Sequence, residues 1–259
     1  MADTEHCIVE RDGHLLRVTI NRPERMNALH PPANFELAKA FDEFAADPDL
    51  WIAIITGAGE RAFSAGNDLK YQAEGNKIEV PPSGFAGLTS RYDLNKPVIA
   101  AVNGIAMGGG FEIALAADII IASDNAIFAL PEPRVGLAAL AGGLHRLPRQ
   151  IPVKQAMGMI LTGRRVDAKE GQALGFVNEV VAPGALMETA QKWADMILEC
   201  SPMSIRASKE AVYNGLDEPV LERAVTGKYP AVMKLFKSED FVEGPMAFAQ
   251  KRKPEWKGR

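Results

Sequence analysis

The sequence has little cysteine and no long apolar run. Its two cysteines, Cys7 and Cys200, lie far apart and form no CxxC pair, which excludes a disulfide scaffold and a zinc knuckle. No apolar stretch reaches the roughly 18 residues that span a bilayer, so we expect no membrane partner. Lysine and arginine total 29 against 33 acidic residues, and the net charge of −4 excludes the basic footprint of a general nucleic-acid-binding protein.

The remaining composition is that of an ordinary globular protein. Hydrophobic residues make up 47% and charged residues 24% of the 259 positions, enough for one large domain or two small ones. The first six residues, MADTEH, are acidic and polar, unlike a secretory signal. We therefore expect a cytoplasmic protein with a large core and no nucleic-acid partner.

The first half of the chain has the pattern of an α/β core. Residues 8–20 alternate around Asp12-Gly13 and predict a β-hairpin, because this pair accepts the positive φ of a tight turn. Apolar spacing predicts a helix between Pro31-Pro32 and Asp47-Pro48. Continuous apolar runs predict buried strands at 50–56, 98–102 and 119–122, and a proline- and glycine-rich segment predicts a mobile surface loop at 75–87.

The second half is helical. Apolar periodicity predicts helices at 153–162, 167–174, 184–200, 204–214, 220–236 and 239–251, with a kink at Pro230 in the fifth. One α/β core followed by a helical C-terminal part is the simplest architecture.

Two glycine-rich turns follow buried strands. The first spans residues 62–70, and the second, 103–112, contains Gly108-Gly109-Gly110 and continues into an apolar helix. Glycines at such a strand-to-helix junction leave backbone N–H groups free to bind an anion or a developing oxyanion. A tight turn with close helix–strand packing explains the glycines equally well.

Two glutamates are candidate acids or bases. Glu112 lies in the first turn of the apolar helix, where the helix dipole favours a carboxylate but burial raises its pKa. Glu132 ends an apolar strand between two prolines that restrict its backbone, although an exposed turn glutamate is the commoner case. Opposing influences of this kind suit a general acid or base near neutral pH.

Other catalytic motifs fit poorly. Residues 57–62 match a loose dinucleotide fingerprint, but poor helix-forming sequence follows them. The chain has no HExxH, G-x-S-x-G or Walker motif, and its four scattered histidines show no metal-ligand spacing. We expect no metal site.

Together these stretches resemble the crotonase, or enoyl-CoA hydratase/isomerase, superfamily over nearly the whole chain. Within it the chain is most similar to hydratases of the carnitinyl-CoA dehydratase type, partly from residues 84–89. The resemblance implies a spiral of ββα units at 1–200 holding the CoA and catalytic site, and a C-terminal helical trimerisation region at 201–259. The matching motifs are Arg22-Pro23 with Asn27-Ala28-Leu29, and residues 63–69, 108–112, 130–132, 161–164 and 238–259.

The resemblance also implies a function. The backbone N–H groups of Asn67 and Gly109 would form an oxyanion hole for a CoA thioester. Glu112 would activate the water that adds to the β-carbon, and Glu132 would protonate the α-carbon. No cofactor beyond the coenzyme A of the substrate is implied, and the assembly would be a homotrimer or a dimer of trimers. The implied CoA-binding residues are Arg25, Ala28, Ala65, Asp68, Leu69, Lys70 and, from a neighbouring subunit, Lys251.

One segment departs from the family pattern. Where many relatives have a proline and then a polar or small residue, this chain has Ala139 and Leu140. We expect Leu140 and Gly142 to border the acyl pocket, with Leu140 reshaping it. A carnitinyl-CoA dehydratase (crotonobetainyl-CoA hydratase) or an enoyl-CoA isomerase are alternatives within the family. A noncatalytic acyl-CoA- or RNA-binding protein and a nicotinamide oxidoreductase are alternatives from other classes.

Overall fold

The computed structural model describes residues 4–259, and within this range the strands form two sheets. The expectation drawn from the acidic N-terminus rests partly on residues 1–3, which lie outside this range. The six-stranded sheet has the order β1 (Cys7–Asp12), β2 (Leu15–Ile20), β3 (Ile52–Gly57), β5 (Val98–Val102), β7 (Ile119–Ser123) and β10 (Glu179–Val181). The four-stranded sheet has the order β4 (Ala62–Ser64), β6 (Ile105–Met107), β8 (Ile127–Ala129) and β9 (Val166–Asp167).

The sheets are built from a repeated pair of strands. A buried strand of the large sheet is followed by a short strand of the small sheet, as in β3–β4, β5–β6 and β7–β8. The first two pairs lead into helices α2 (Leu69–Ala73) and α3 (Gly109–Ala116). This repeat is the predicted spiral of ββα units. The predicted hairpin is also confirmed, since β1 pairs antiparallel with β2 around Gly13, whose φ is +56°.

The central strands of the large sheet, β3, β5 and β7, are buried on both faces. Alternate residues of β3 point to opposite sides, so Ile52 and Ile54 pack with α7 (Leu186–Leu198), whereas Ala53 and Ile55 belong to the main core. Helix α1 (Pro31–Ala46) contributes the fully buried Phe41 to that core. Burial on both faces explains why the strands are continuous apolar runs.

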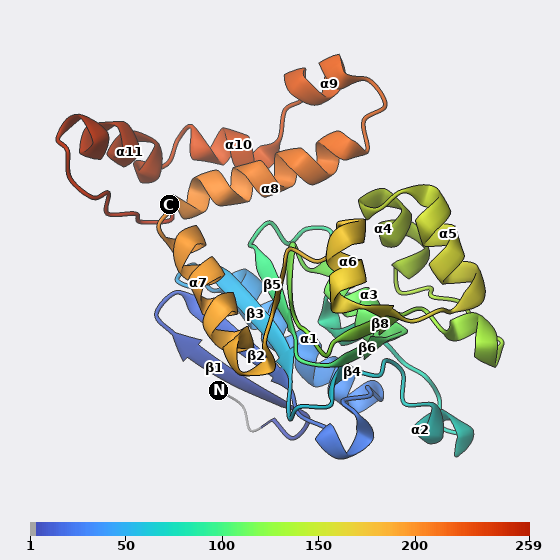
Figure 1. Cartoon of the computed structure of the whole chain (residues 1–259). Helices are drawn as coiled ribbons and strands as arrows, with labels where there is room; N and C mark the ends of the chain where they lie inside the picture. Colours follow the sequence, from blue (N-terminus) through green and yellow to red (C-terminus); the bar gives the residue numbers. More distant parts are fainter. Residues whose placement is uncertain (1–3) are drawn as a thin grey trace.

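Short helices surround the small sheet. Figure 1 shows α4, α5 and α6 gathered on the side of β8, while α2 lies at the opposite, lower edge. These three helices are α4 (Gly143–Gln150), α5 (Val153–Thr162) and α6 (Ala168–Leu174), and η3 (Glu132–Val135) contacts α5. Of the other short helices, η1 (Pro23–Arg25) follows β2, η2 (Phe85–Gly87) packs on α1, and η4 (Pro183–Ala185) packs on α7.

The C-terminal helices form an outer layer above the core in Figure 1. They are α8 (Pro202–Leu216), α9 (Leu221–Thr226), α10 (Pro230–Leu235) and α11 (Glu239–Ala249). The prediction of one kinked helix at 220–236 is wrong: α9 ends where Gly227 leaves the helical region, and Tyr229 is extended before Pro230. Of the helices in the described range, none has the length and apolar character that a membrane crossing requires.

The predicted mobile loop at 75–87 is partly wrong. Its end forms η2, in which Phe85 and Ala86 are buried. The Asn34 side chain of α1 accepts a hydrogen bond from the Ala86 N–H at 2.8 Å. Gly87 packs directly on Ala38 of the same helix, where a side chain would not fit. This segment therefore belongs to the core and positions Phe85 beside α3.

Candidate active site

The two glycine-rich turns meet at the start of α3. Gly66 has a φ of +86°, and a Cβ atom there would lie 2.7 Å from the Met107 carbonyl oxygen and 2.8 Å from the Gly109 nitrogen. A side chain on Gly110 would overlap the Ser64 carbonyl group. Close packing thus requires the glycines, and it also brings the N-terminus of α3 beside the loop that carries Asn67.

The N–H groups of Asn67 and Gly109 are both available. Leu29 bridges to this loop by donating to the Gly66 carbonyl at 2.7 Å and accepting from the Asp68 N–H at 3.0 Å. The intervening N–H of Asn67 consequently faces away from Leu29. Gly109 is the first residue of α3 and has no intrahelical acceptor. Within residues 4–259 neither N–H donates to a protein acceptor.

Glu112 is a buried carboxylate in the first turn of α3. It is 3% exposed, and its Oε1 accepts a hydrogen bond from the Gly143 N–H at 2.8 Å. Burial is the main cause that raises its pKa to about 7, and the nearby Glu132 carboxylate acts in the same direction. The hydrogen bonds from the backbone at Gly143 and Ala141 and the charge of Arg146 oppose this rise. The group therefore changes protonation state near neutral pH.

Glu132 approaches the same helix start from another segment. Strand β8 already ends at Ala129, so Glu132 opens η3 rather than ending the strand as predicted. Its Oε1 lies 3.0 Å from the position that a Cβ atom on Gly108 would take. Its Oε2 is buried and has no hydrogen-bond partner in the described part of the chain. Burial raises the pKa of Glu132, which favours the protonated form.

An apolar cavity of about 130 Å³ adjoins Glu132. Leu140 does not line it and is 81% exposed in the single chain, so this cavity gives no support to the expectation that Leu140 borders an acyl pocket. Its buried neighbour Ala139 lines the cavity instead. Gly142, with a φ of +110°, precedes α4 as its N-cap residue, and the N–H of the next residue, Gly143, donates to Glu112. The cavity is lined by Leu130, Glu132, Pro133, Ala138, Ala139, Leu144, Ile160 and Leu161.

Most of the predicted CoA-binding residues gather around the bridge between Leu29 and Asn67. Ala28 is buried beside this bridge, Ala65 is partly exposed, and Leu69 and Lys70 are exposed in α2. Arg25 is exposed in η1. The structure thus brings six of the seven residues to the β-bridge between Leu29 and Asn67 and to the turns that flank it. These six are Arg25, Ala28, Ala65, Asp68, Leu69 and Lys70.

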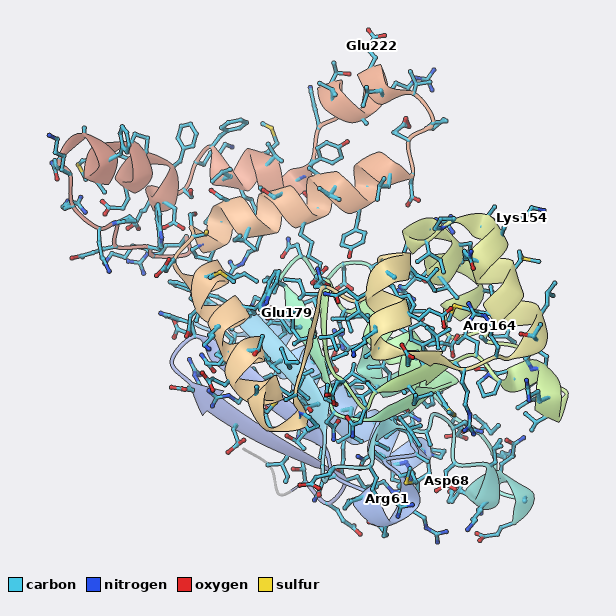
Figure 2. All side chains as sticks on the ribbon, in the orientation of Figure 1. Arg61, Asp68, Lys154, Arg164, Glu179 and Glu222 are labelled. Carbon is cyan, nitrogen blue, oxygen red and sulfur yellow. The ribbon has the colours of Figure 1, made fainter. Side chains whose placement is uncertain are left out.

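Asp68 has a structural role that the sequence did not reveal. Its carboxylate pairs with Arg22 at 3.1 Å and accepts the Tyr71 N–H at 3.2 Å as the cap of α2. Burial pushes the pKa of Asp68 upward, but these two partners outweigh it and hold the pKa below its ordinary value. Figure 2 shows Asp68 at the lower end of the molecule, by the start of α2.

Lys251 lies elsewhere. It follows α11, and Figure 1 shows α11 and α2 at opposite ends of the molecule. One chain therefore does not bring Lys251 to the other predicted CoA-binding residues, and the prediction requires a neighbouring subunit.

The competing motifs find no support in the geometry. After Gly57 the chain turns into strand β4 and not into the helix that a dinucleotide fingerprint needs. Among residues 4–259 no group of three or more His, Cys, Asp or Glu side chains is arranged to hold a metal ion.

Three contributors to the site were missed from the sequence. Gly143 donates to Glu112, and Arg146 lies one turn further along α4. Phe85 covers Gly109: a Cβ atom on Gly109 would lie 2.6 Å from the ring. Each depends on a contact between distant segments. Only residues 85–88 carried a local signal in the sequence, namely their apolar composition.

A spiral of ββα units, two free N–H groups, and one buried and one partly buried glutamate at one helix start define the class of protein. The chain belongs to the enoyl-CoA hydratase/isomerase family, whose sequence profile it matches over residues 10–259. It is an enzyme of the hydro-lyase type found in that family. The predicted family, fold class and enzyme class are confirmed.

Particular relatives cover the chain almost completely. The carnitinyl-CoA dehydratase of Citrobacter koseri is 47% identical over 258 residues, which cover 96% of this chain and 97% of the relative. The carnitinyl-CoA dehydratase of Escherichia coli K12 is 46% identical, with 99% and 100% covered.

Solved structures of related hydratases share the fold of this chain. An enoyl-CoA hydratase from Mycobacterium tuberculosis H37Rv has a TM-score of 0.92 and 37% identity, with 98% of this chain and 99% of that chain covered. A carnitinyl-CoA hydratase from Mycobacterium avium has a TM-score of 0.78 and 41% identity, with the same coverage.

Proposed function

We propose that this enzyme catalyses the reversible syn addition of water to a 2-enoyl-CoA, giving a 3-hydroxyacyl-CoA. The observation that supports this most is the pair of carboxylates at the N-terminus of α3, the buried Glu112 and the partly buried Glu132. Both have raised pKa values, and that of Glu112 is about 7. Isomerisation of a double bond needs only proton transfer, whereas water addition uses both a base for the water and an acid for the α-carbon.

The thioester carbonyl oxygen would accept hydrogen bonds from the N–H groups of Asn67 and Gly109. When water adds to the β-carbon, the π electrons move to this oxygen and an enolate forms. Two fixed N–H donors stabilise that charge without reorganising, an effect worth about 10²–10³ in rate per donor in other enzymes. The positive end of α3 acts in the same direction.

The two glutamates would exchange one proton each per turnover. Ionised Glu112, held by Gly143, takes a proton from water as the new C–O bond forms. Protonated Glu132 gives its proton to the α-carbon as the enolate collapses. Transfer of one proton between the two carboxyl groups through solvent restores the starting state, and the reverse sequence dehydrates the product.

The apolar cavity favours a short uncharged acyl chain over the trimethylammonium group of crotonobetainyl-CoA. Its described lining contains no aromatic side chain, and quaternary ammonium groups are commonly bound by aromatic faces. The relatives named carnitinyl-CoA dehydratase support the second candidate, crotonobetainyl-CoA hydration. The two candidates differ only in the substrate tail.

The test is a comparison of crotonyl-CoA with crotonobetainyl-CoA as substrates. We expect the larger kcat/KM for crotonyl-CoA, and a larger value for crotonobetainyl-CoA would favour the second candidate. Ile160→Phe, which fills the cavity, should slow longer 2-enoyl-CoAs more than crotonyl-CoA. Met157→Phe on the same helix is the matched control, because Met157 does not line the cavity. If wild-type enzyme hydrates neither ester but binds CoA, the proposal fails.

We also propose a homotrimer or a dimer of trimers. Many large apolar side chains are exposed on the C-terminal helices, and such patches mark association surfaces. Size-exclusion chromatography with light scattering tests this, and a monomer at micromolar concentration contradicts it. The exposed apolar residues are Leu216, Leu221, Val225, Met233, Phe236, Phe241, Val242, Met246 and Phe248.

The remaining proposals are a core at 1–200 with an oligomerisation region at 201–259, a cytoplasmic location, and catalysis without a metal or nicotinamide. Dialysis against EDTA tests the metal proposal directly. Activity that is lost with EDTA and restored by one divalent cation contradicts it.

A further inference from the structure

Arg146 lies between the Glu112 side of the site and the side of the proposed oxyanion hole. It is in α4, one helical turn after Gly143, which donates to Glu112. Its Nη2 donates to the Thr89 carbonyl oxygen at 2.8 Å, and its Nη1 reaches the Ala141 carbonyl oxygen at 3.5 Å. One guanidinium group therefore spans two segments that are far apart in the sequence.

The guanidinium group is held closely at this place. Its Cζ lies 5.7 Å from the centre of the Tyr92 ring. It also packs against Gly142, where a side chain would overlap its Nη1 atom. The positive φ of Gly142 and the absence of a Cβ atom are thus what let Arg146 reach back across the start of its own helix.

The Thr89 side leads to the proposed oxyanion hole. Thr89 is 1% exposed, and its Oγ1 accepts a hydrogen bond from the Phe85 N–H at 2.8 Å. The Phe85 ring in turn packs against Gly109. Arg146 is therefore linked through two residues to the backbone that carries one of the two proposed oxyanion donors.

The Ala141 side leads to Glu112. The backbone at Ala141 and Gly143 supplies hydrogen bonds to the Glu112 carboxylate, and the charge of Arg146 lowers the pKa of Glu112. The other charged group that affects Glu112 is Glu132, which raises the pKa of Glu112. The charge of Arg146 also lowers the pKa of Tyr213 of α8, but burial outweighs it and raises that pKa above its ordinary value, so that Tyr213 is neutral in the working range.

We propose that Arg146 is a positioning residue. It fixes residues 141–143, which hold the Glu112 carboxylate, relative to residues 85–89, which pack on Gly109. This inference rests on the proposed function of Glu112 as the base. A lysine cannot replace the guanidinium group fully, because an ammonium group is a point charge without the planar fork that reaches two carbonyls. The geometric and the electrostatic contributions of Arg146 can therefore be separated by substitution.

The experiment compares Arg146→Lys, Arg146→Met and the control Arg149→Met. Arg149 is on the same helix, is exposed, and donates to the carbonyl oxygen of His145 within that helix at 3.0 Å. Steady-state kinetics with crotonyl-CoA give kcat and KM, and NMR titration of ¹³C-carboxyl-labelled glutamate gives the pKa of Glu112, with Glu112→Gln assigning the signal. Melting temperatures report stability separately.

We expect Arg146→Met to lower kcat at least about tenfold with KM changed less than about threefold, because positioning errors reduce the chemical step. The pKa of Glu112 should rise in Arg146→Met and remain near the wild-type value in Arg146→Lys, which keeps the charge. Arg146→Lys should still lose kcat, and Arg149→Met should change none of these quantities.

Equal kcat in Arg146→Met and Arg149→Met would overturn the proposal. So would a fall in melting temperature in both Arg146 variants with wild-type kcat and an unmoved pKa, since that pattern belongs to a purely structural residue. If Arg146→Met does not fold, Arg146→Lys alone decides, through its kcat. If wild-type enzyme hydrates neither crotonyl-CoA nor crotonobetainyl-CoA, the proposed function fails, while the NMR titration still tests the link between Arg146 and Glu112.

Discussion

Replacing Glu112 by glutamine should stabilise the folded protein at alkaline pH while abolishing turnover. In the folded chain the pKa of Glu112 is raised from 4.5 to about 7. A raised pKa means that the folded state resists ionisation. Ionisation of Glu112 therefore lowers the free energy of unfolding. This loss is absent below pH 4.5, where Glu112 is protonated in both the folded and the unfolded state, and it grows until the pH exceeds the pKa of the folded state.

The size of the effect follows from this shift. A difference of about 2.5 pKa units corresponds to roughly 3.5 kcal/mol per chain above pH 8, at about 1.4 kcal/mol per unit. Glutamine carries no charge and still presents an oxygen to the Gly143 N–H, so the variant avoids this cost. For a chain of this size about 3.5 kcal/mol raises the melting temperature by roughly 7–14 °C.

The assay is thermal unfolding of wild type and Glu112→Gln at pH 5 and at pH 8.5. We expect the two melting temperatures to be close at pH 5 and clearly separated at pH 8.5, with the variant higher. Glu188→Gln is the control, because Glu188 is exposed and its pKa is lowered by a hydrogen bond from Lys192. A difference between wild type and Glu112→Gln that is the same at both pH values would refute the reasoning.

Three further predictions concern the rest of the site. Glu132→Gln should lower kcat by about 10²-fold or more with little change in CoA affinity, and stopped-flow hydration together with CoA titration checks this. Gly109→Ala should lower kcat because its new methyl group strikes Phe85, and Gly109→Ala combined with Phe85→Ala should recover part of the loss; no recovery would contradict the packing. Arg22→Ala should destabilise the fold by about 3–5 kcal/mol, since it leaves the buried carboxylate of Asp68 without its cation, and urea unfolding measures this.

Local sequence patterns predicted the elements whose structure follows from their own residues. The run at 98–102 is strand β5 with the same limits, because a strand buried on both faces must be apolar at every position. The glycines at 108–110 were correctly placed at a strand-to-helix junction. The hairpin at Gly13 followed from turn chemistry alone.

Elements fixed by distant contacts were not predictable in this way. The three-residue strands β4 and β6 are too short to show a period, and they exist because the small sheet pairs them. Residues 85–87 have the composition of a loop, but Asn34 and Ala38 of α1 hold them in the core. The helix at 220–236 divides because Gly227 and the residue before Pro230 adopt extended backbone.

The candidate site likewise contains residues that local sequence patterns predicted and residues that only distant contacts bring into place. The glutamates and the glycine turns were found from sequence because their chemistry is local: charge in an apolar helix and missing side chains at a turn. Gly143 donates to Glu112 across 31 positions, so no local pattern could indicate it. Leu140 and Ala139 lie in a turn without periodicity, and only the fold decides which of them is buried.

The central claim is that Glu112 and Glu132 together add water to an enoyl thioester. The most direct test is the loss of the conjugated enoyl-thioester absorbance of crotonyl-CoA with wild type, Glu112→Gln and Glu132→Gln, measured between pH 5.5 and 9. We predict rapid loss with wild type, a hydration rate that rises with pH as Glu112 ionises near pH 7, and little loss with either variant. Wild-type turnover in either variant would contradict the claim.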